Sequence, residues 1–277
     1  MKVGAGAGGP IGVFDSGIGG FSVLRVLQAQ LPNEDFIFFG DQGHIPYGPR
    51  SLEEVRGFSE AIVRFLLAEG SKLIVVACNT ASAAALVHLR KTFPDVPFVG
   101  MEPAVKPAAE TTQSGVVGVI ATKATFQGEL YASVVERFAQ DVIVLQATCP
   151  GLVEEIEAGR LEGEIAREIL EIALRPMMMK GIDAVVLGCT HYPFVENLIR
   201  ELVGHRVRII EPSGAIARQV ERLLDEHKLR NPNNQVGTTR YFTSGKSEAM
   251  EEAALQLLGV AVTAEGIGWE SGEVSRG

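Results

Sequence analysis

The sequence predicts an α/β fold with two similar domains, each a mainly parallel sheet flanked by helices, and an active site in the cleft between them. First, short apolar runs alternate with helical-period segments along the 277 residues. Second, runs such as LIVVA (73–77) and AVVLG (184–188) lack polar alternation, as expected of strands covered on both faces. Third, the chain contains an approximate internal repeat, in which an apolar strand of each half ends in a cysteine.

The expected strands are the runs rich in β-branched and aromatic residues. They lie at 11–14, 35–39, 73–77, 97–101, 116–121, 142–147, 184–188, 208–210 and 240–243. Helices are expected between them. The helix within 51–69 starts with a capping box of Ser51 and Glu54 and ends before Gly70. Strands that alternate with helices need crossover connections, which favour parallel pairing.

The repeat is clearest around two cysteines. Residues 70–78 (GSKLIVVAC) and 181–189 (GIDAVVLGC) both begin with Gly, continue as an apolar strand and end in Cys. GVFDS at 12–16 and GVIAT at 118–122 form a second similar pair. Chance similarity is the alternative, because buried strands use few residue types, but it does not explain the matched cysteines. We therefore expect two similar halves, each presenting a thiol.

The repeat also suggests domain boundaries. We expect a flexible N-terminal arm at 1–10, a first α/β domain at 11–105 plus 212–260, a second at 106–211, and a C-terminal tail at 261–277. The arm is Gly/Ala-rich and lacks the apolar segment of a secretory signal. No apolar run is long enough to span a bilayer. These features predict a cytoplasmic protein.

The amino-acid composition limits the classes of partner that the protein is expected to bind. Hydrophobic residues make up 46% and charged residues 21%, which predicts a globular protein rather than a disordered one. Three cysteines suit a reducing compartment. A net charge of −9 argues against a nucleic-acid or anionic-membrane surface, since both need a basic footprint. We expect a small-molecule substrate, no nucleic acid and no membrane, and we leave a homodimer open.

Cys78 and Cys189 are the candidate reactive groups. Each follows an apolar strand, and open α/β sheets bind ligands at the carboxyl ends of their strands. Helices should begin near Thr80 and Tyr192, and a helix N-terminus stabilises a thiolate. A lone Cys after a strand is more often a packing residue, but two in equivalent positions indicate function. Cys149 has no such twin, and we interpret it as structural.

Polar residues near the two thiols are further candidates. His191 follows Cys189 by two residues and could hold or return a proton. Asp15 ends the first strand, and helix capping is its alternative role. Hydroxyl and amide side chains that could bind a carboxylate also occur at strand ends: Ser16, Asn79, Thr80, Thr122, Thr125 and Thr190.

Cofactor motifs do not fit the chain, so we expect neither cofactor nor metal. The Gly-rich turn at 15–20 (DSGIGG) fails the dinucleotide fingerprint, because the third glycine is Gly20 and position 22 is Ser. Its backbone N–H groups could still bind an anion. No lysine stands in a Schiff-base motif. The remaining histidines, His44, His88, His205 and His227, lack metal-ligand spacing.

Five motifs, in their order and spacing, resemble those of the glutamate racemase family. They are DSGIGG (15–20), PYG (46–48), ACNTAS (77–82), IATKAT (120–125) and GCTHYP (188–193). The resemblance runs from about residue 11 to about residue 259. Paired thiol motifs are typical of the cofactor-independent aspartate/glutamate racemase superfamily, and DSG together with PYG points to its glutamate branch.

The resemblance implies interconversion of L- and D-glutamate by two thiols without a cofactor, which supplies D-glutamate for peptidoglycan. It implies Cys78 and Cys189 as acid/base groups, the first supported by Asp15 and the second by His191. A supporting glutamate in the helix after the Cys-Pro dipeptide falls on Glu157. The implied substrate shell is Asp15, Ser16, Pro46, Tyr47, Gly48, Asn79, Thr80, Thr122, Thr125, Thr190 and His191.

Two thiols suit inversion of an α-carbon, which requires removal of a proton from one face and delivery of another to the opposite face. Three alternatives stay open. One is an aspartate racemase or another two-cysteine isomerase. A second is a cysteine hydrolase that uses Cys189 with His191, for which Cys78 would be dispensable. The third is a non-catalytic sensor that binds acidic amino acids without exchanging their α-hydrogen.

Overall fold

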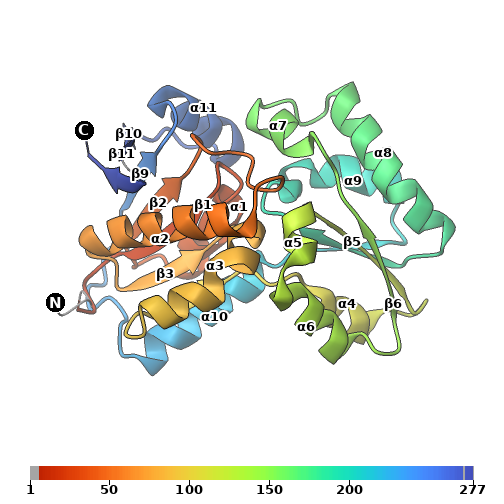
Figure 1. Cartoon of the computed structure of the whole chain (residues 1–277), viewed down its shortest axis with the longest axis horizontal. Helices are drawn as coiled ribbons and strands as arrows, with labels where there is room; N and C mark the ends of the chain where they lie inside the picture. The colour runs from red at the N-terminus through yellow and green to blue at the C-terminus, as the bar shows by residue number, and fades with distance from the viewer. Residues whose placement is uncertain (1–5, 271, 277) are drawn as a thin grey trace.

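The computed structural model describes residues 6–270 and 272–276, which form two α/β units lying side by side (Figure 1). The unit on the left in this view contains a six-stranded sheet, and the unit on the right a four-stranded sheet. All described strand pairs within these two sheets are parallel. The predicted fold class is confirmed.

The first sheet has the strand order β10-β9-β2-β1-β3-β4. Its strands are β1 (Ile11–Asp15), β2 (Phe36–Gly40), β3 (Leu73–Val76), β4 (Phe98–Gly100), β9 (Thr239–Thr243) and β10 (Ala264–Gly266). β1 is central and pairs with β2 and β3, so that Asp15 lies opposite Gly40 at the carboxyl edge. The end of β1 is therefore placed in the middle of that edge.

Helices cover both faces of this sheet. They are α1 (Phe21–Gln30), α2 (Leu52–Ala68), α3 (Asn79–Thr92), α10 (Ser213–Glu226) and α11 (Ser247–Leu258). Val13 packs with Leu24 and Val220 on the side of α1, α10 and α11, whereas the next residue, Phe14, packs with Ile62 and Leu86 on the side of α2 and α3. Alternate residues thus supply two cores, as expected of a strand buried on both faces.

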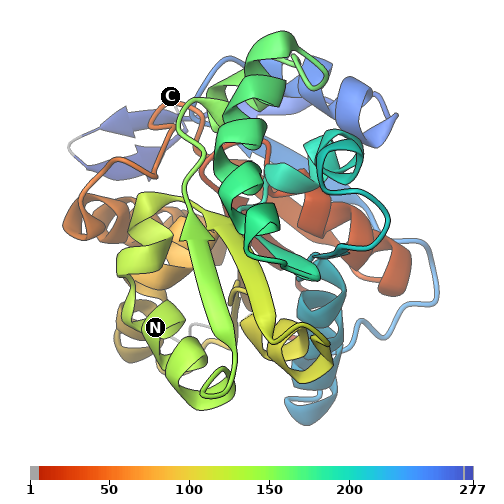
Figure 2. The ribbon, with the colours of Figure 1, turned by 90° about the vertical axis from the view of Figure 1, so that its right-hand side faces the viewer.

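The second sheet has the order β6-β5-β7-β8, and Figure 2 shows this unit facing the viewer. Its strands are β5 (Val116–Ala121), β6 (Ile143–Ala147), β7 (Ala184–Gly188) and β8 (Arg208–Ile210). Its helical segments are α4 (Val105–Thr111), α5 (Lys123–Gln127), α6 (Glu129–Phe138), α7 (Leu152–Glu157), α8 (Glu164–Met179), the 3₁₀ turn η1 (Tyr192–Val195) and α9 (Glu196–Val203). One core lies under α7, α8 and α9, and the other under α4 and α6.

The two sheets share one topology. Strands β2-β1-β3-β4 of the first and β6-β5-β7-β8 of the second have the same order when the strands of each unit are counted along the chain. The paired sequences of the internal repeat thus fall on equivalent strands, β1 with β5 and β3 with β7. Cys78 and Cys189 follow β3 and β7, so both thiols lie at the carboxyl ends of equivalent strands.

The nine expected strands are all present, with ends that differ by a residue or so, and the capping box of Ser51 and Glu54 opens α2. The segment expected as a C-terminal tail differs. Ala264–Gly266 joins the first sheet as β10, and β11 (Gly268–Glu270) pairs antiparallel with β12 (Glu273–Ser275). These strands are short, which leaves little pattern in the sequence to detect.

Other expectations concern the chain ends and the domain division. Residues 1–5 of the expected N-terminal arm lie outside the described residues, and the Ala7 carbonyl accepts a hydrogen bond from Lys72 Nζ at 2.6 Å. The division into 11–105 plus 212–260 and 106–211 stays a prediction. Within the described residues, no helix combines the length and apolar character that crossing a bilayer requires.

Candidate active site

A cavity of about 320 Å³ lies where the carboxyl ends of strands from both units meet. This volume is at the small end of the range of small-molecule sites. Ser16, Cys78 and Asn79 line it from the first unit, and Thr122 and Cys189 from the second. The two thiols that the repeat singles out therefore share one cavity.

Cys78 is the N-cap residue of α3. Its backbone is extended, and its sulfur accepts a hydrogen bond from the backbone N–H of Ala81 at 3.4 Å. The Sγ atom lies 3.7 Å from Ser16 Oγ. Burial and then the nearby Asp15 carboxylate raise the pKa of the Cys78 thiol, although the Ala81 and Ser16 contacts oppose this. Cys78 is accordingly in the thiol form at neutral pH.

Cys189 has a different set of neighbours. Its Sγ lies 3.8 Å from His191 Nδ1, and the other ring nitrogen of His191 lies 2.6 Å from Glu157 Oε1. Burial acts to lower the pKa of His191, but the hydrogen bonds to Cys189 and Glu157 outweigh it and raise this pKa well above its usual value. His191 can therefore hold a proton between the sulfur of Cys189 and the carboxylate of Glu157.

Asp15 connects the two units beneath the cavity. Its side chain is fully buried, and it accepts hydrogen bonds from Thr190 Oγ1 at 3.0 Å and from the Gly17 backbone N–H at 3.0 Å. Burial raises the pKa of the Asp15 carboxyl, and His191 and the two donors partly offset that effect. Asp15 influences Cys78 through its charge, since the two side chains share no direct hydrogen bond.

The Gly-rich turn after β1 binds an anion, and that anion is a side chain of the protein. The backbone N–H of Ile18 donates to Glu157 Oε1 at 2.8 Å. A Cβ on Gly17 would overlap Glu157 Oε1, and a Cβ on Gly19 would overlap the ring of His191. The glycines therefore provide room for the second unit's carboxylate and imidazole to approach the backbone.

This close approach predicts the outcome of Gly19→Ala. The added methyl group has to displace His191, so we expect a loss of stability of about 1–3 kcal/mol and a lower turnover number. Gly57→Ala is the matched control, because nothing lies within 4 Å of its Cβ position in α2 and Ala favours a helix. Thermal unfolding and initial rates measure both effects. Wild-type stability and turnover in Gly19→Ala would contradict this role of the turn.

Hydroxyl groups meet where the units join. Thr80 Oγ1 lies 2.8 Å from Thr122 Oγ1, which lies 2.9 Å from Thr125 Oγ1. Next to them, the side chain of Asn79 is 2% exposed, and among the described residues neither its oxygen nor its nitrogen has a hydrogen-bond partner. A buried amide without partners at a cavity wall is expected to bind a polar ligand.

Most of the sequence-predicted site residues line the cavity. Those that do are Ser16, Pro46, Tyr47, Gly48, Cys78, Asn79, Thr80, Thr122, Cys189, Thr190 and His191. Asp15, Thr125 and Glu157 lie behind this wall and contact residues that form it. The cavity also has lining residues that sequence reasoning missed: Pro49, Lys123, Thr148, Cys149, Pro150, Gly151, Val153, Glu154 and Tyr192.

The segment from Thr148 to Gly151 could have been found. It follows β6, whose carboxyl end faces the same cavity as those of β5 and β7. The lack of a repeat partner predicts a structural role for Cys149, and the structure places this residue in the cavity wall. It is buried, and burial raises its pKa to about 12. No group of three or more His, Cys, Asp or Glu side chains within the described part of the chain has metal-binding geometry.

The sequence profile of the Asp/Glu/Hydantoin racemase family matches residues 11–220. A glutamate racemase of Ectopseudomonas mendocina is 48% identical over 250 residues, which cover 90% of this chain and 95% of that protein. The crystal structure of glutamate racemase isoform RacE1 from Bacillus anthracis has a TM-score of 0.85 and 32% identity, covering 96% of this chain and 98% of that one.

A further solved structure, that of glutamate racemase from Francisella tularensis in complex with D-glutamate, has a TM-score of 0.82 and 32% identity. It covers 94% of this chain and 97% of that chain.

Proposed function

Because the chain belongs to the Asp/Glu/Hydantoin racemase family, we propose that it interconverts L- and D-glutamate by proton transfer at the α-carbon between two thiols. The observation that carries this proposal is the shared cavity, in which Cys78 and Cys189 extend from equivalent strand ends of two similar units. The similar protein from Francisella tularensis binds D-glutamate, which supports glutamate as the ligand.

The two thiols have different surroundings, and we propose that they therefore start the reaction in different protonation states. The buried position of Cys78 beside Asp15 favours its thiol form, and we propose that Cys189, beside His191, is the base that acts on L-glutamate. Cys189 then removes the α-proton of L-glutamate, and Cys78 delivers a proton to the opposite face. For D-glutamate the transfers reverse, and Cys78 must first be deprotonated. The two enantiomers have equal free energies, so the enzyme lowers the activation barrier between them and leaves their equilibrium ratio at one.

The substrate-binding groups follow from the cavity wall. The α-hydrogen of an amino acid is weakly acidic, so donors aimed at the α-carboxylate must stabilise the charge that develops in the transition state. Asn79 and the hydroxyls of Ser16, Thr80 and Thr190 are the donors that we assign to this task. They are neutral, and they leave room beside the reacting carbon.

The direct test uses purified, pyridoxal-free protein in heavy water. We expect each glutamate enantiomer to exchange its α-hydrogen for deuterium and to convert to the other. Aspartate, tested in parallel, addresses the aspartate racemase alternative. A protein that binds glutamate without exchange would be a sensor, and one that converts aspartate faster would be an aspartate racemase.

Activity should survive dialysis against a chelator. The basis is that the acid and base assigned here are thiols, and the described His, Cys, Asp and Glu side chains form no metal-binding group. Racemisation rates before and after dialysis are the measurement, with a zinc-dependent enzyme treated in the same way as control. Loss of activity that one divalent ion restores would overturn this prediction.

We further propose that the protein acts in the cytoplasm and supplies D-glutamate for peptidoglycan. A strain depleted of this protein should then need external D-glutamate to keep its cell wall. Growth of the depleted strain with and without D-glutamate measures this requirement. Growth that is unaffected by depletion would contradict the proposal.

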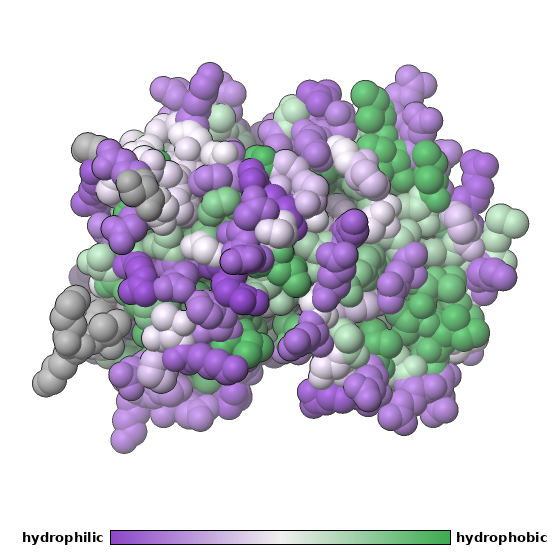
Figure 3. Space-filling model, in the orientation of Figure 1, coloured by the Kyte–Doolittle hydropathy of each residue, from purple (hydrophilic) through white to green (hydrophobic). Residues whose placement is uncertain are grey.

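We also propose a homodimer, which the sequence leaves open. Exposed apolar side chains gather on the second unit, where Figure 3 shows much of the green surface in the right half. Three of them, Ile165, Ile172 and Met179, are spaced by seven residues along one side of α8. Sedimentation should show a dimer for the wild type and a monomer for Ile172→Glu. A monomeric wild type would overturn this proposal.

A further inference from the structure

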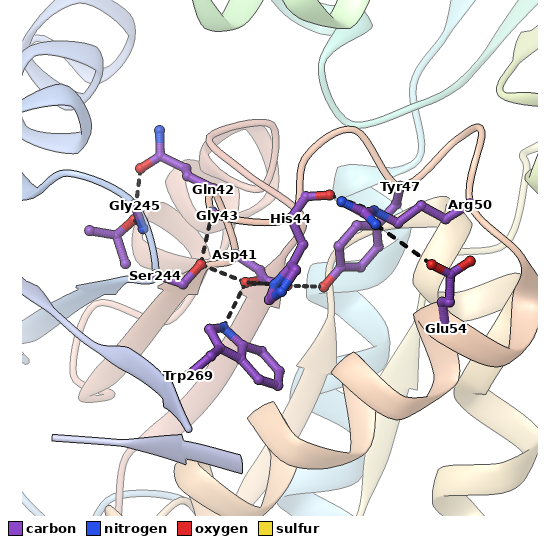
Figure 4. A network of polar contacts seen from close by, with 11 residues as sticks. Asp41, Gln42, Gly43, His44, Tyr47, Arg50, Glu54, Ser244, Gly245 and Trp269 are labelled. Atoms are coloured by element: carbon purple, nitrogen blue, oxygen red, sulfur yellow. Dashed lines mark hydrogen bonds and ion pairs between the residues drawn. The ribbon is translucent and has the colours of Figure 1, made fainter. Parts of the chain in front are cut away.

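The loop after β2 contains a buried carboxylate, Asp41, that several side chains share (Figure 4). The phenol of Tyr47 donates to Asp41 Oδ2 at 2.5 Å, and the hydroxyl of Ser244 donates to Oδ1 at 2.5 Å. The indole N–H of Trp269 donates to Oδ1 at 3.2 Å. His44 Nδ1 lies 3.0 Å from both oxygens. Asp41 thus joins the loop to residues more than 200 positions later in the chain.

Aromatic packing fixes the same arrangement. The ring of His44 stacks on Phe58 with centroids 4.1 Å apart, and Trp269 meets His44 edge-on at 4.7 Å. Phe58 also contacts Trp269 at 5.6 Å and Tyr47 at 5.7 Å. Trp269 therefore has two separable interactions, aromatic contacts through its ring and a hydrogen bond through its nitrogen.

Tyr47 connects this cluster to the cavity. Pro46, Tyr47 and Gly48 all line the cavity, and Tyr47 is 2% exposed. Burial raises the pKa of Tyr47 well above its usual value, and the charge of Asp41 adds to this effect. The phenol is therefore a permanent donor, and its bond to Asp41 fixes the side chain from the end opposite the peptide backbone.

The C-terminal hairpin that carries Trp269 is anchored independently of the cavity. Ile267, just before β11, is buried, and its N–H donates to the Thr243 carbonyl at 2.8 Å. Val274 in β12 packs against the core under α2, and Arg276 pairs with Glu69 at 3.1 Å. The hairpin lies outside residues 11–220, to which the family profile matches.

We propose that the C-terminal hairpin positions the cavity segment 46–48, with Trp269 acting through Asp41 on Tyr47. Trp269 is thus a positioning residue for the substrate, which it does not touch. This inference rests on the proposed function, since it takes glutamate as the ligand of the cavity.

The first experiment removes the hydrogen bond and keeps an aromatic ring. In Trp269→Phe we expect KM for both glutamate enantiomers to rise roughly 5-fold, the effect of one ordinary hydrogen bond, with kcat within about 2-fold of wild type. Val274→Ala is the control, because it weakens the same hairpin without touching Asp41. It should lower the melting temperature and leave KM unchanged. An unchanged KM in Trp269→Phe would overturn the inference.

A double-mutant cycle tests the route through Tyr47. Tyr47→Phe removes the hydroxyl group that donates a hydrogen bond to Asp41, and this change alone should raise KM. If Trp269 acts through Asp41 on Tyr47, adding Trp269→Phe should raise KM little further. Increases that multiply would mean that Trp269 acts by another route, and the inference would fail.

A binding readout separates this inference from the proposed function. Trp269 is the single tryptophan of the chain, so intrinsic tryptophan emission reports on the hairpin alone. An equimolar mixture of L- and D-glutamate, in which racemisation makes no net change, should shift this emission, and Tyr47→Phe should remove the shift. A shift without any racemisation supports the inference and overturns the proposed reaction. Racemisation with no shift overturns the inference.

Discussion

Cys78→Ala and Cys189→Ala should each lower the racemisation rate by roughly 10³-fold or more, since each variant lacks one of the two groups that move a proton. Both thiols line one cavity and lie at equivalent strand ends of the two units. The measurement is the rate of optical inversion starting from each pure enantiomer.

The two variants should differ in which glutamate enantiomer still exchanges its α-hydrogen. Cys78→Ala keeps Cys189 with His191, so it should slowly exchange the α-hydrogen of L-glutamate in heavy water and return a deuteron to the same face. Cys189→Ala should do the same with D-glutamate. This outcome, exchange without inversion, is specific to a mechanism with one base on each face.

Cys149→Ala is the matched control, because Cys149 is a buried thiol in the same cavity wall. Its raised pKa keeps it a thiol. Unlike Cys78 and Cys189, it is not one of a pair of cysteines at the ends of equivalent strands. We expect most of the activity to remain. Full activity in Cys78→Ala or Cys189→Ala would eliminate the two-thiol mechanism, and the hydrolase alternative requires that result for Cys78.

His191→Asn should lower the turnover number for L-glutamate by about 10-fold or more. The turnover number for D-glutamate should fall by less. The imidazole lies between Cys189 and Glu157, on the side of the thiol that we assign to L-glutamate. Asn keeps a polar side chain but cannot carry a proton as the imidazole does. Turnover numbers measured from each enantiomer give the comparison.

Equilibrium thermodynamics constrains how this asymmetry is observed. For a racemisation with an equilibrium constant of one, the two kcat/KM values must be equal in every variant, so unequal losses of kcat must be matched by changes in KM. If His191→Asn kept the wild-type turnover number for both enantiomers, His191 would be a binding or structural residue. The two thiols would then stand alone as the catalytic groups.

The pH dependence should follow the same group. The pKa of His191 is raised, so its protonated form persists above the usual range and is lost as pH rises through the new value. Turnover of D-glutamate, in which the side of Cys189 and His191 must supply a proton, should therefore fall at alkaline pH in the wild type as the imidazole loses its proton. His191→Asn has no such group, and its profile should lack this decrease.

The sequence predicted the sheets well because their strands are buried on both faces. A strand such as β3 or β7 must be continuously apolar, and this constraint is visible without a structure. The repeat added more information, since it identified Cys78 and Cys189 as equivalent. Asn79 also followed from its place after a strand, and the structure adds that its amide lacks partners among the described residues.

Contacts between distant segments were harder to predict. The sequence predicts that the Gly-rich turn could bind an anion, but whether Glu157 reaches Ile18 depends on how the two units dock. The same holds for Trp269 and Asp41, which are 228 positions apart. Local patterns carry no information about such pairs, because a hydrogen bond across the fold leaves no periodicity in the chain.

The shared strand order of the two units has a stereochemical consequence. Two segments built from L-amino acids can be superposed by rotation and translation but never by reflection, whereas L- and D-glutamate are related only by reflection. Equivalent thiols can therefore serve mirror-image substrates only through a planar state of the α-carbon, whose two faces are related by reflection in that plane. The substituents of that carbon are not exchanged by the rotation, so nothing requires Ser16 and His191, beside the two thiols, to match.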